Sequence, residues 1–439
     1  MLHRRTLARR SITALVGLVL AAAGPAAGQT DCYWGDPLGG IFGDPGHWLP
    51  PGPPGPDDRA IFDIADTYTV TFTDYHTVER LWVDRGDVTF DLAGWSFEAD
   101  HLYGGGADPL SVHIGDNAGV HTNCRLTVTN GDVHSWEMEI GKWEENVGEL
   151  VVSTGAYWGG ENWFTVGAYG TGRLTIEDGG VFQHGGAMLG FGGDYGTGIV
   201  TVTDPGSRFD VGCLEIGKYP GAWSGARGAL SVQNGAVATC DNAVLGFEAG
   251  ATGQATVDGA GSLWEMTIIG PTSSIGKGGS GSVAVSNGGR VVVAGALEVG
   301  SEAGSDGSVI VDGAGSALEL TNDSLPTTIG SQGGGSLVVR NGGKVTAGLD
   351  IEVGKHPGSR GAMTVSGLGS RVDCARILGV GVSGEGSLSV EAGAAVVVWA
   401  DFHIGMNSRA SVTVTGAGSS VSCPGWGGLF VAYGNTGDA

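Results

Sequence analysis

The chain has 439 residues, 85 of them glycine, and a formal net charge of −24 at pH 7. This acidic balance argues against nucleic acids and anionic membranes as partners, because phosphate groups are bound by clusters of Lys and Arg. The glycines follow no collagen-like period and alternate with ordered aliphatic segments, so they indicate the corners of a folded chain and not disorder.

Residues 1–28 are predicted to be a secretory signal peptide. Four arginines within the first ten residues precede an apolar stretch over residues 12–23, and Ala26-Ala27-Gly28 supplies a small-residue cleavage site. The apolar stretch is too short to span a membrane, and no later segment could cross a bilayer as a helix. We therefore expect an exported protein, at the cell surface or in the extracellular space.

Residues 29–110 are predicted to cap the fold and to form its irregular first coils. The segment is rich in tryptophan and has a proline-rich stretch over residues 50–56, followed by strand-like alternation around Tyr68, Leu81 and Val88. Stacked strands leave unpaired backbone groups at the end of a stack, and aromatic bulk is one way to cover them.

Residues 111–439 contain one repeated unit. Its first part is an aliphatic-x-aliphatic triplet that recurs every 24 to 30 residues, a period typical of solenoids. The triplets begin at Leu126, Leu150, Leu174, Val200, Leu230, Ala255, Val283, Val309, Leu337, Met363, Leu388 and Val412. Each has the period-two alternation of a half-buried strand, whose two outer residues point inward.

A second triplet, aliphatic-x-aliphatic-Gly, follows in each unit, as at residues 214–217, 297–300 and 351–354. One coil of about 26 residues cannot bury its apolar side alone, so the coils are expected to stack, with each strand parallel to its counterparts above and below. We therefore predict an all-β fold, a parallel β-helix (β-solenoid) of about 12 regular coils.

The turn after the first triplet alternates between two forms. One is Asn-Gly or Asp-Gly, as at Asn287-Gly288, and the other is Gly-x-Gly-Ser, as at residues 313–316. Both suit a corner that needs positive φ, which Gly, Asn and Asp adopt at low cost. The repeating unit is thus predicted to be a pair of coils.

This alternation, L-x-V-x-N-G-G followed by V-x-V-x-G-A-G-S, each with a later L-x-V-G, resembles the Gly-rich repeats associated with type V secretion and PEP-CTERM proteins of bacteria. The resemblance extends over residues 110–439. It implies an exported cell-surface solenoid with a scaffold, spacer or adhesin-like role, and it implies no catalytic residue.

A carbohydrate-active enzyme is the alternative prediction, because several polysaccharide lyases and hydrolases are parallel β-helices. Such a site needs carboxylates, or Arg and Lys with calcium, that converge on one outer groove. The outward-facing Glu139, Glu215, Glu298 and Glu352 lie several coils apart and cannot share one scissile bond. We therefore expect no enzymatic activity and no catalytic, cofactor or metal site. A groove that gathers three or more Asp, Glu, His or Arg side chains from adjacent coils would favour the enzyme.

A glycan-binding module is a further alternative. Trp136, Trp143, Trp158 and Trp163 lie near the start of the regular coils, and exposed tryptophan suits stacking on sugars. The same tryptophans could instead belong to the aromatic cap. The partners expected on this basis are surface polysaccharides or matrix.

Six cysteines in an exported chain raise the question of disulfides. Cys213 and Cys240 lie in adjacent coils at nearly equivalent depth, which makes a bridge across one stacking step a candidate, with free thiols as the alternative. Cys374 and Cys423 are separated by two stacking steps, roughly 9.6 Å, which is beyond the reach of a disulfide.

The last strand-like triplet ends at Val431, shortly before Ala439. We expect either that the chain is a fragment of a longer protein or that its open last coil continues into, or pairs with, another chain.

Overall fold

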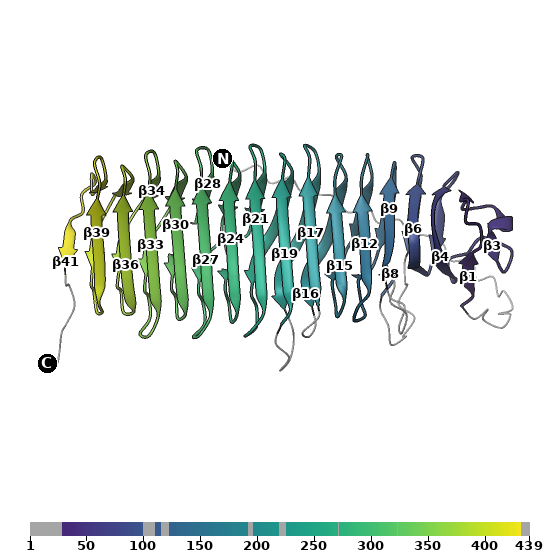
Figure 1. Cartoon of the computed structure of the whole chain (residues 1–439), viewed down its shortest axis with the longest axis horizontal. Helices are drawn as coiled ribbons and strands as arrows, with labels where there is room; N and C mark the ends of the chain where they lie inside the picture. Colours follow the sequence, from purple (N-terminus) through teal and green to yellow (C-terminus); the bar gives the residue numbers. More distant parts are fainter. Residues whose placement is uncertain are drawn as a thin grey trace, which may run out of the picture.

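The computed structural model describes residues 29–99, 110–115, 123–191, 196–218, 225–270, 272–322 and 324–431. The predicted signal peptide, residues 1–28, lies outside the described residues. The described chain forms a rod of about 14 turns with about 26 residues per turn, and equivalent strands lie side by side along the rod (Figure 1). The predicted all-β parallel solenoid is therefore confirmed.

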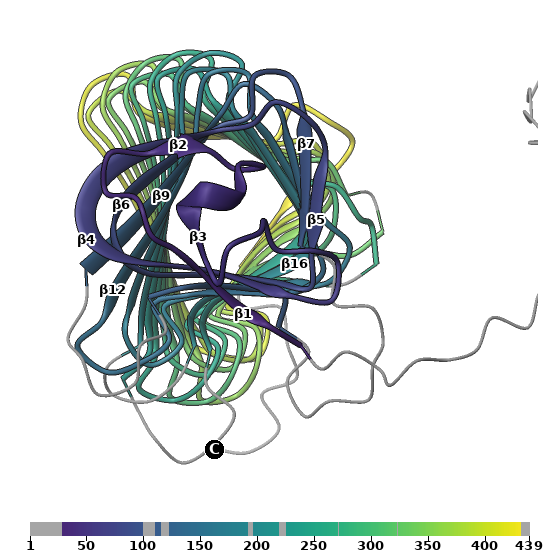
Figure 2. The same cartoon turned by 90° about the vertical axis from the view of Figure 1, so that its right-hand side faces the viewer.

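Each coil has three sides when the rod is viewed from its end (Figure 2), and we call them the first, second and third faces in chain order. The first face carries the longest regular strands. They are β9 (Asn123–Thr129), β12 (Val147–Val152), β15 (Thr171–Ile176), β17 (Thr197–Thr203), β19 (Arg227–Gln233), β21 (Thr252–Asp258), β24 (Ser280–Ser286), β27 (Asp306–Asp312), β30 (Gly334–Arg340), β33 (Arg360–Ser366), β36 (Glu385–Glu391) and β39 (Ala410–Thr415).

The twelve predicted triplets form one inward column on this face. The register places Leu126 opposite Leu150 and continues without a slip to Leu388 opposite Val412. Tyr68 and Val88 extend the same column by two earlier coils. Register is held this strictly because a one-residue slip would turn every apolar side chain to solvent.

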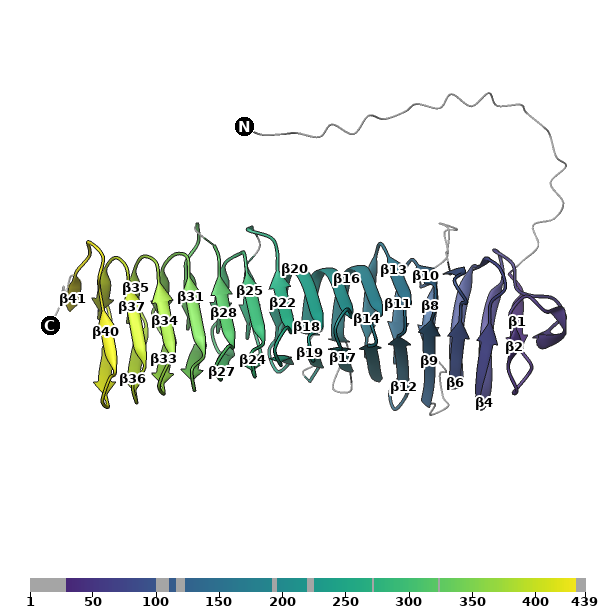
Figure 3. The ribbon, with the colours of Figure 1, turned by 90° about the horizontal axis from the view of Figure 1, so that it is seen from above.

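The second and third faces carry shorter strands, which follow one another in the same order along the rod (Figure 3). On the second face lie β5 (His76–Val78), β7 (Ser96–Ala99), β10 (Asp132–Ser135), β13 (Tyr157–Gly160), β22 (Leu263–Met266), β25 (Arg290–Val293), β28 (Ala317–Leu320), β31 (Lys344–Ala347), β34 (Arg371–Cys374), β37 (Ala395–Val398) and β40 (Ser420–Ser422). On the third face lie β8 (Val112–Ile114), β11 (Met138–Ile140), β14 (Trp163–Val166), β23 (Ser273–Ile275), β26 (Leu297–Val299), β29 (Thr327–Ile329), β32 (Ile351–Val353), β35 (Leu378–Val380), β38 (Phe402–Ile404) and β41 (Leu429–Val431).

Five of the described strands bend around a corner and serve two faces. Three of them join the second face to the third: β16 (Val181–Phe191), β18 (Arg208–Lys218) and β20 (Val237–Leu245). Two join the third face to the first face of the next coil: β4 (Arg59–Thr71) and β6 (Arg80–Asp91).

The N-terminal segment lies across the open end of the first coil (Figure 2). It consists of β1 (Asp31–Trp34), β2 (Gly40–Ile41), the 3₁₀ helix η1 (Pro45–His47) and β3 (Trp48–Leu49). Among the described strands, β1 and β3 form the single antiparallel pair. Trp48 is buried there, and its Nε1–H donates to the Phe42 carbonyl oxygen at 2.7 Å. Aromatic bulk thus covers the end of the stack, as the fold prediction requires.

The first corner, between the first and second faces, confirms the predicted positive φ values. Asn287 has a φ of 52° and Gly313 a φ of 95°. The two corner forms are also joined by hydrogen bonds that the sequence did not reveal. Ser316 Oγ donates to the Asp312 carbonyl oxygen in its own coil at 2.7 Å, and it accepts from the N–H of Gly288, in the Asn-Gly corner of the preceding coil, at 3.1 Å.

The same serine contact recurs at every second coil. Its members are Gly179 with Ser207, Gly235 with Ser262, Gly288 with Ser316, Gly342 with Ser370 and Gly393 with Ser419. The glycine of each of these corners, which follows Asn, Asp or, at residue 392, Ala, has an amide that the serine of the next coil satisfies. This complementarity gives the predicted two-coil unit a physical reason.

Candidate functional site

The third corner, between the third face of one coil and the first face of the next, is closed by glycines. Gly300 has a φ of 71°, and a Cβ on Gly307 would lie 2.4 Å from the Gly300 nitrogen and 2.2 Å from the Ile275 carbonyl oxygen. Real Cβ atoms are essentially never found so close to backbone. The joint therefore has no room for a side chain.

Equivalent glycines stack in one column along the first face. They are Gly148, Gly172, Gly198, Gly228, Gly253, Gly281, Gly307, Gly335, Gly361 and Gly386. Toward the N-terminus the column continues through Cys124 to Gly86. Cys124 is thus an exception to the glycine rule at this joint.

A groove of about 860 Å³ opens at this exception and extends over four coils. Its floor contains Ala65, Gly86 and Cys124, which have small side chains or none. The parallel pairing of β4 with β6 is itself irregular here, with register shifts between Phe62 and Thr67. The hollow therefore lies where the repeat is least regular.

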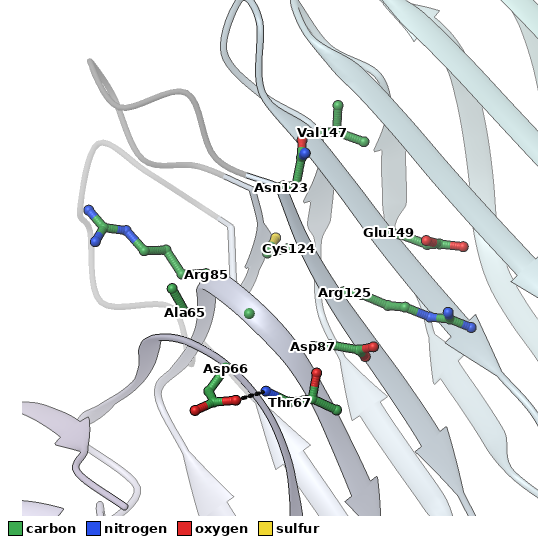
Figure 4. Close-up of a pocket in the computed structure, with 11 residues that line it drawn as sticks. Ala65, Asp66, Thr67, Arg85, Asp87, Asn123, Cys124, Arg125, Val147 and Glu149 are labelled. Carbon is green, nitrogen blue, oxygen red and sulfur yellow. Dashed lines mark hydrogen bonds between the residues drawn. The ribbon is translucent and has the colours of Figure 1, made fainter. Parts of the chain in front are cut away.

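Charged side chains line both sides of the groove (Figure 4). Asp66 and Arg85 lie on one side, and Asp87, Arg125 and Glu149 lie on the other. Arg85 Nε lies 3.1 Å from an oxygen of Asp63, and Asp66 accepts from the Thr67 N–H at 2.8 Å. The first side is therefore already engaged by its own neighbours.

The second side is not engaged in this way. Asp87 is opposite Arg125 and Arg125 is opposite Glu149 in the register, so the signs alternate from coil to coil. Nevertheless, within the described residues none of the three side chains forms an ion pair or a side-chain hydrogen bond with another residue, and the buried Arg125 Nε has no hydrogen-bond partner. Hydrogen-bonding capacity remains unused on this side of the groove.

Several charged side chains elsewhere on the rod form ion pairs. Three of the four predicted outward glutamates pair with lysines at i+3: Lys142 with Glu139 at 3.3 Å, Lys218 with Glu215 at 2.5 Å and Lys355 with Glu352 at 3.2 Å. The fourth, Glu298, has Ser301 at that position. Phe247 lies between two lysines, with Lys218 Nζ 4.8 Å and Lys277 Nζ 3.7 Å from its ring centroid. These columns neutralise local charge and hold corners together.

The groove meets the condition set above for the enzyme alternative, because it gathers more than three charged side chains from adjacent coils. Asp87 and Glu149 are separated by the coil of Arg125, or roughly 9.6 Å of stacking. Carboxylates and a guanidinium so placed can accept from and donate to hydroxyl groups. Within the described residues, no group of three or more His, Cys, Asp or Glu could hold a metal ion. The absence of enzymatic activity remains a prediction.

The four predicted glycan-contacting tryptophans do not form one row. The prediction that Trp158 is a surface contact is wrong. Trp158 occupies an inward position opposite Val133 and is fully buried. Its Nε1–H donates to Ser135 Oγ at 3.0 Å. Trp136 and Trp163 are half-buried. Trp143 is 42% exposed, so it alone among the four offers a largely open ring.

Tyr169 is a second exposed aromatic residue at the same corner, and it was not among the residues predicted from the sequence. It is 44% exposed, and its N–H donates to the Lys142 carbonyl oxygen, one residue from Trp143 in the preceding coil. Both rings occupy the second position after the glycine of the second triplet, Gly141 and Gly167. That shared offset is the signal that could have identified the pair.

Cys213 and Cys240 are not brought together for a disulfide. Cys213 is opposite Asn242, and Cys240 is opposite Val211, so the two positions differ by two residues in register. Both thiols are free. Burial raises the pKa of the Cys240 thiol to about 12 and also raises that of Cys213, which disfavours the thiolate that disulfide formation needs.

Among the described residues, no helix is long and apolar enough to cross a membrane. The sequence matches no protein-family model and no curated protein. Among solved structures, the crystal structure of a TibC-catalysed, hyper-glycosylated TibA fragment is similar, with 16% identity and a TM-score of 0.37 over 81% of this chain and 99% of the fragment. A likeness of this size carries no conclusion about the present chain.

Proposed function

We propose that this chain is an exported, non-enzymatic β-solenoid that acts as a surface scaffold, spacer or adhesin-like rod. The unbroken register of the first face supports this role, because it stacks every coil on one apolar core that runs from Cys32 to Phe402. At roughly 4.8 Å per coil, about 14 turns give a stiff body of about 65 Å. Its length is set by the number of coils.

The repeated corners present residues to the solvent, where a partner could contact them. Each coil carries an outward turn of one of the two alternating forms. The residue at the tip of a Gly-x-Gly-Ser turn can vary, as at Leu368, which is 85% exposed. Weak contacts repeated along a stiff rod add up through effective concentration. The mechanism proposed is therefore mechanical and multivalent.

Export is tested by expressing the full chain in a bacterium with and without residues 1–28. We expect the full chain to leave the cytoplasm and to be cleaved by a protease added to intact cells, whereas the shortened chain is protected. Equal protection of the two chains would contradict an exported surface rod.

The non-enzymatic part of the proposal is tested separately. The purified protein without residues 1–28 is incubated with a panel of neutral and uronic-acid polysaccharides, and released ends or unsaturated products are measured. We expect none above the level of a heat-denatured sample. Release of products from any polysaccharide would replace the rod with the carbohydrate-active enzyme.

A further inference from the structure

The third corner of the early coils combines two features that occur side by side nowhere else in the described residues. One is the charged groove, which begins in the coil of Thr67 and ends in the coil of Glu149. The other is the exposed pair Trp143 and Tyr169. Trp143 belongs to the turn whose Asn146 N–H donates to the Trp143 carbonyl oxygen at 3.0 Å, and Val147, directly after that turn, lines the groove.

The unpaired groups of the groove have matched hydrogen-bonding capacities. Asp87 and Glu149 contribute carboxylate acceptors, whereas Arg125 between them contributes donors only. Because the three together carry a formal charge of −1, the surface disfavours an anionic ligand and favours a neutral one that carries many groups able both to donate and to accept. The hydroxyls of a sugar have this property.

The aromatic pair supplies the second requirement of a sugar site. Aromatic rings with one open face stack on the apolar C–H face of a pyranose, while nearby polar groups bind its hydroxyls. Trp143 and Tyr169 lie in successive coils, so their backbones are roughly 4.8 Å apart along the rod. Together with the groove they extend along the rod axis and not across it.

We propose that the third corner of these coils, from Asp87 through Arg125, Glu149 and Trp143 to Tyr169, is a binding site for a neutral oligosaccharide that lies parallel to the rod axis. The groove binds the hydroxyls of the sugar and the aromatic pair stacks on its rings. Three stacking steps, roughly 14 Å, accommodate a chain of about three sugar units. The site is independent of whether the rod is exported.

The test uses the purified protein without residues 1–28 and five tetrasaccharide probes: cellotetraose, maltotetraose, mannotetraose, N-acetylchitotetraose and tetragalacturonic acid. Saturation-transfer NMR detects contact, and titration calorimetry gives the affinity. We expect at least one neutral probe to bind with a Kd of about 1 mM or tighter, and the acidic probe to bind more weakly than its neutral counterparts.

Variants then locate the site. Arg125→Gln and Trp143→Ala are each expected to weaken binding by about tenfold or more. Two matched controls make the same substitutions elsewhere on the rod. Arg290→Gln removes a guanidinium that lies 2.8 Å from Glu319, and Trp399→Ala removes a ring that is 53% exposed at another corner. We expect both controls to bind as the unaltered protein does, and circular dichroism to show the same fold for all four variants.

Two results overturn this proposal: none of the neutral probes binds, or the control variants lose as much affinity as the site variants. If the acidic probe binds best, the site recognises carboxylates and the assignment to a neutral sugar is wrong. Cleavage of a bound probe during the NMR experiment would support the binding site but would contradict a non-enzymatic rod, so the two proposals fail separately.

Discussion

The aromatic coils at the N-terminus and the glycine-rich coils from Ser280 onward enclose similar interiors by opposite means. In the first region, rings fill the space: Phe42 stacks on Phe72 with centroids 4.8 Å apart, and Trp48 meets Phe42 edge-on at 5.0 Å. In the second region, aliphatic side chains such as Val283 and Val309 stack in register, and the coils close through joints that hold no side chain. Large side chains fill the first region, whereas glycines without side chains let the coils of the second region close.

The difference shows what each part of a solenoid requires. The end of a stack has no next coil to cover it, so large side chains must fold over the opening. A middle coil is covered on both sides and must instead repeat at the strand spacing, which is set by backbone hydrogen bonds. The cap should therefore be sensitive to lost volume, and the repeats to added volume.

The largest effect is expected from Trp48→Ala in the cap. Trp48 is 1% exposed, and its loss opens a cavity among Trp34, Phe42 and Phe62. Such truncations cost about 3–5 kcal/mol. Hydrogen exchange resolved along the chain should show increased opening in the cap and first coils, while the coils beyond Ser280 keep their protection.

Trp95→Ala is the matched control, because Trp95 lies in the same region and is 45% exposed. It should lower the free energy of unfolding by much less than Trp48→Ala. Equal losses for the two variants, or a loss of protection spread evenly over the rod, would mean that the cap is not a volume-dependent unit.

The free energy of unfolding should depend on pH, because the aromatic interior contains a buried histidine. His184 is 3% exposed between Phe164 and Phe182, and its Nδ1 hydrogen-bonds the Asn162 carbonyl oxygen. Burial lowers the pKa of His184 from 6.5 to about 4. The neutral ring is therefore favoured in the folded state, and its contribution is complete above pH 6.5 and is lost as the pH falls towards 4. The loss amounts to about 3 kcal/mol.

The measurement is the urea midpoint of the unaltered protein and of His184→Leu between pH 7.5 and pH 4. Carboxylates titrate in both proteins, so the difference between the two curves isolates the imidazole. We expect that difference to change between pH 6.5 and pH 4 and to be constant above pH 7. Parallel curves over the whole range would show that the folded protein accepts a charged His184.

Added volume in a repeat is tested by Gly307→Ala. The new Cβ would meet the Ile275 carbonyl oxygen at 2.2 Å and the Gly300 nitrogen at 2.4 Å, and backbone atoms cannot move aside as side chains do. We expect a loss of about 2–3 kcal/mol, typical of overpacking. In Gly304→Ala, in the same coil, a Cβ has no neighbour within 4 Å and only the φ of 86° is unfavourable. A Gly304→Ala variant as unstable as Gly307→Ala would show that backbone conformation, and not space, fixes these glycines.

The fold could be predicted from the sequence because its controlling feature is local and repeated. The triplets from Leu126 to Val412 indicate where each strand lies, which of its residues point inward and how long the period is. The observed register agrees with these predictions throughout. The candidate groove could not be predicted, because it depends on irregular coils around Gly86 that have no repeat to align. Trp158 was misassigned for a related reason: its alternation within β13 could not be fixed without the register to Val133.

The hydrogen bonds between coils could not be predicted from the sequence either, since no pattern within one corner shows which amide the next coil satisfies. Ser316→Ala tests them and is expected to have the smallest effect, about 1–2 kcal/mol. Ser316 is fully buried, and without its hydroxyl the Gly288 N–H has no acceptor. Amide exchange at Gly288 should accelerate, whereas Ser308→Ala, on an outward position of the same coil, should leave it unchanged. If both serines behave alike, the alternation of corners reflects turn geometry alone, and the coil rather than the pair of coils is the unit of stability.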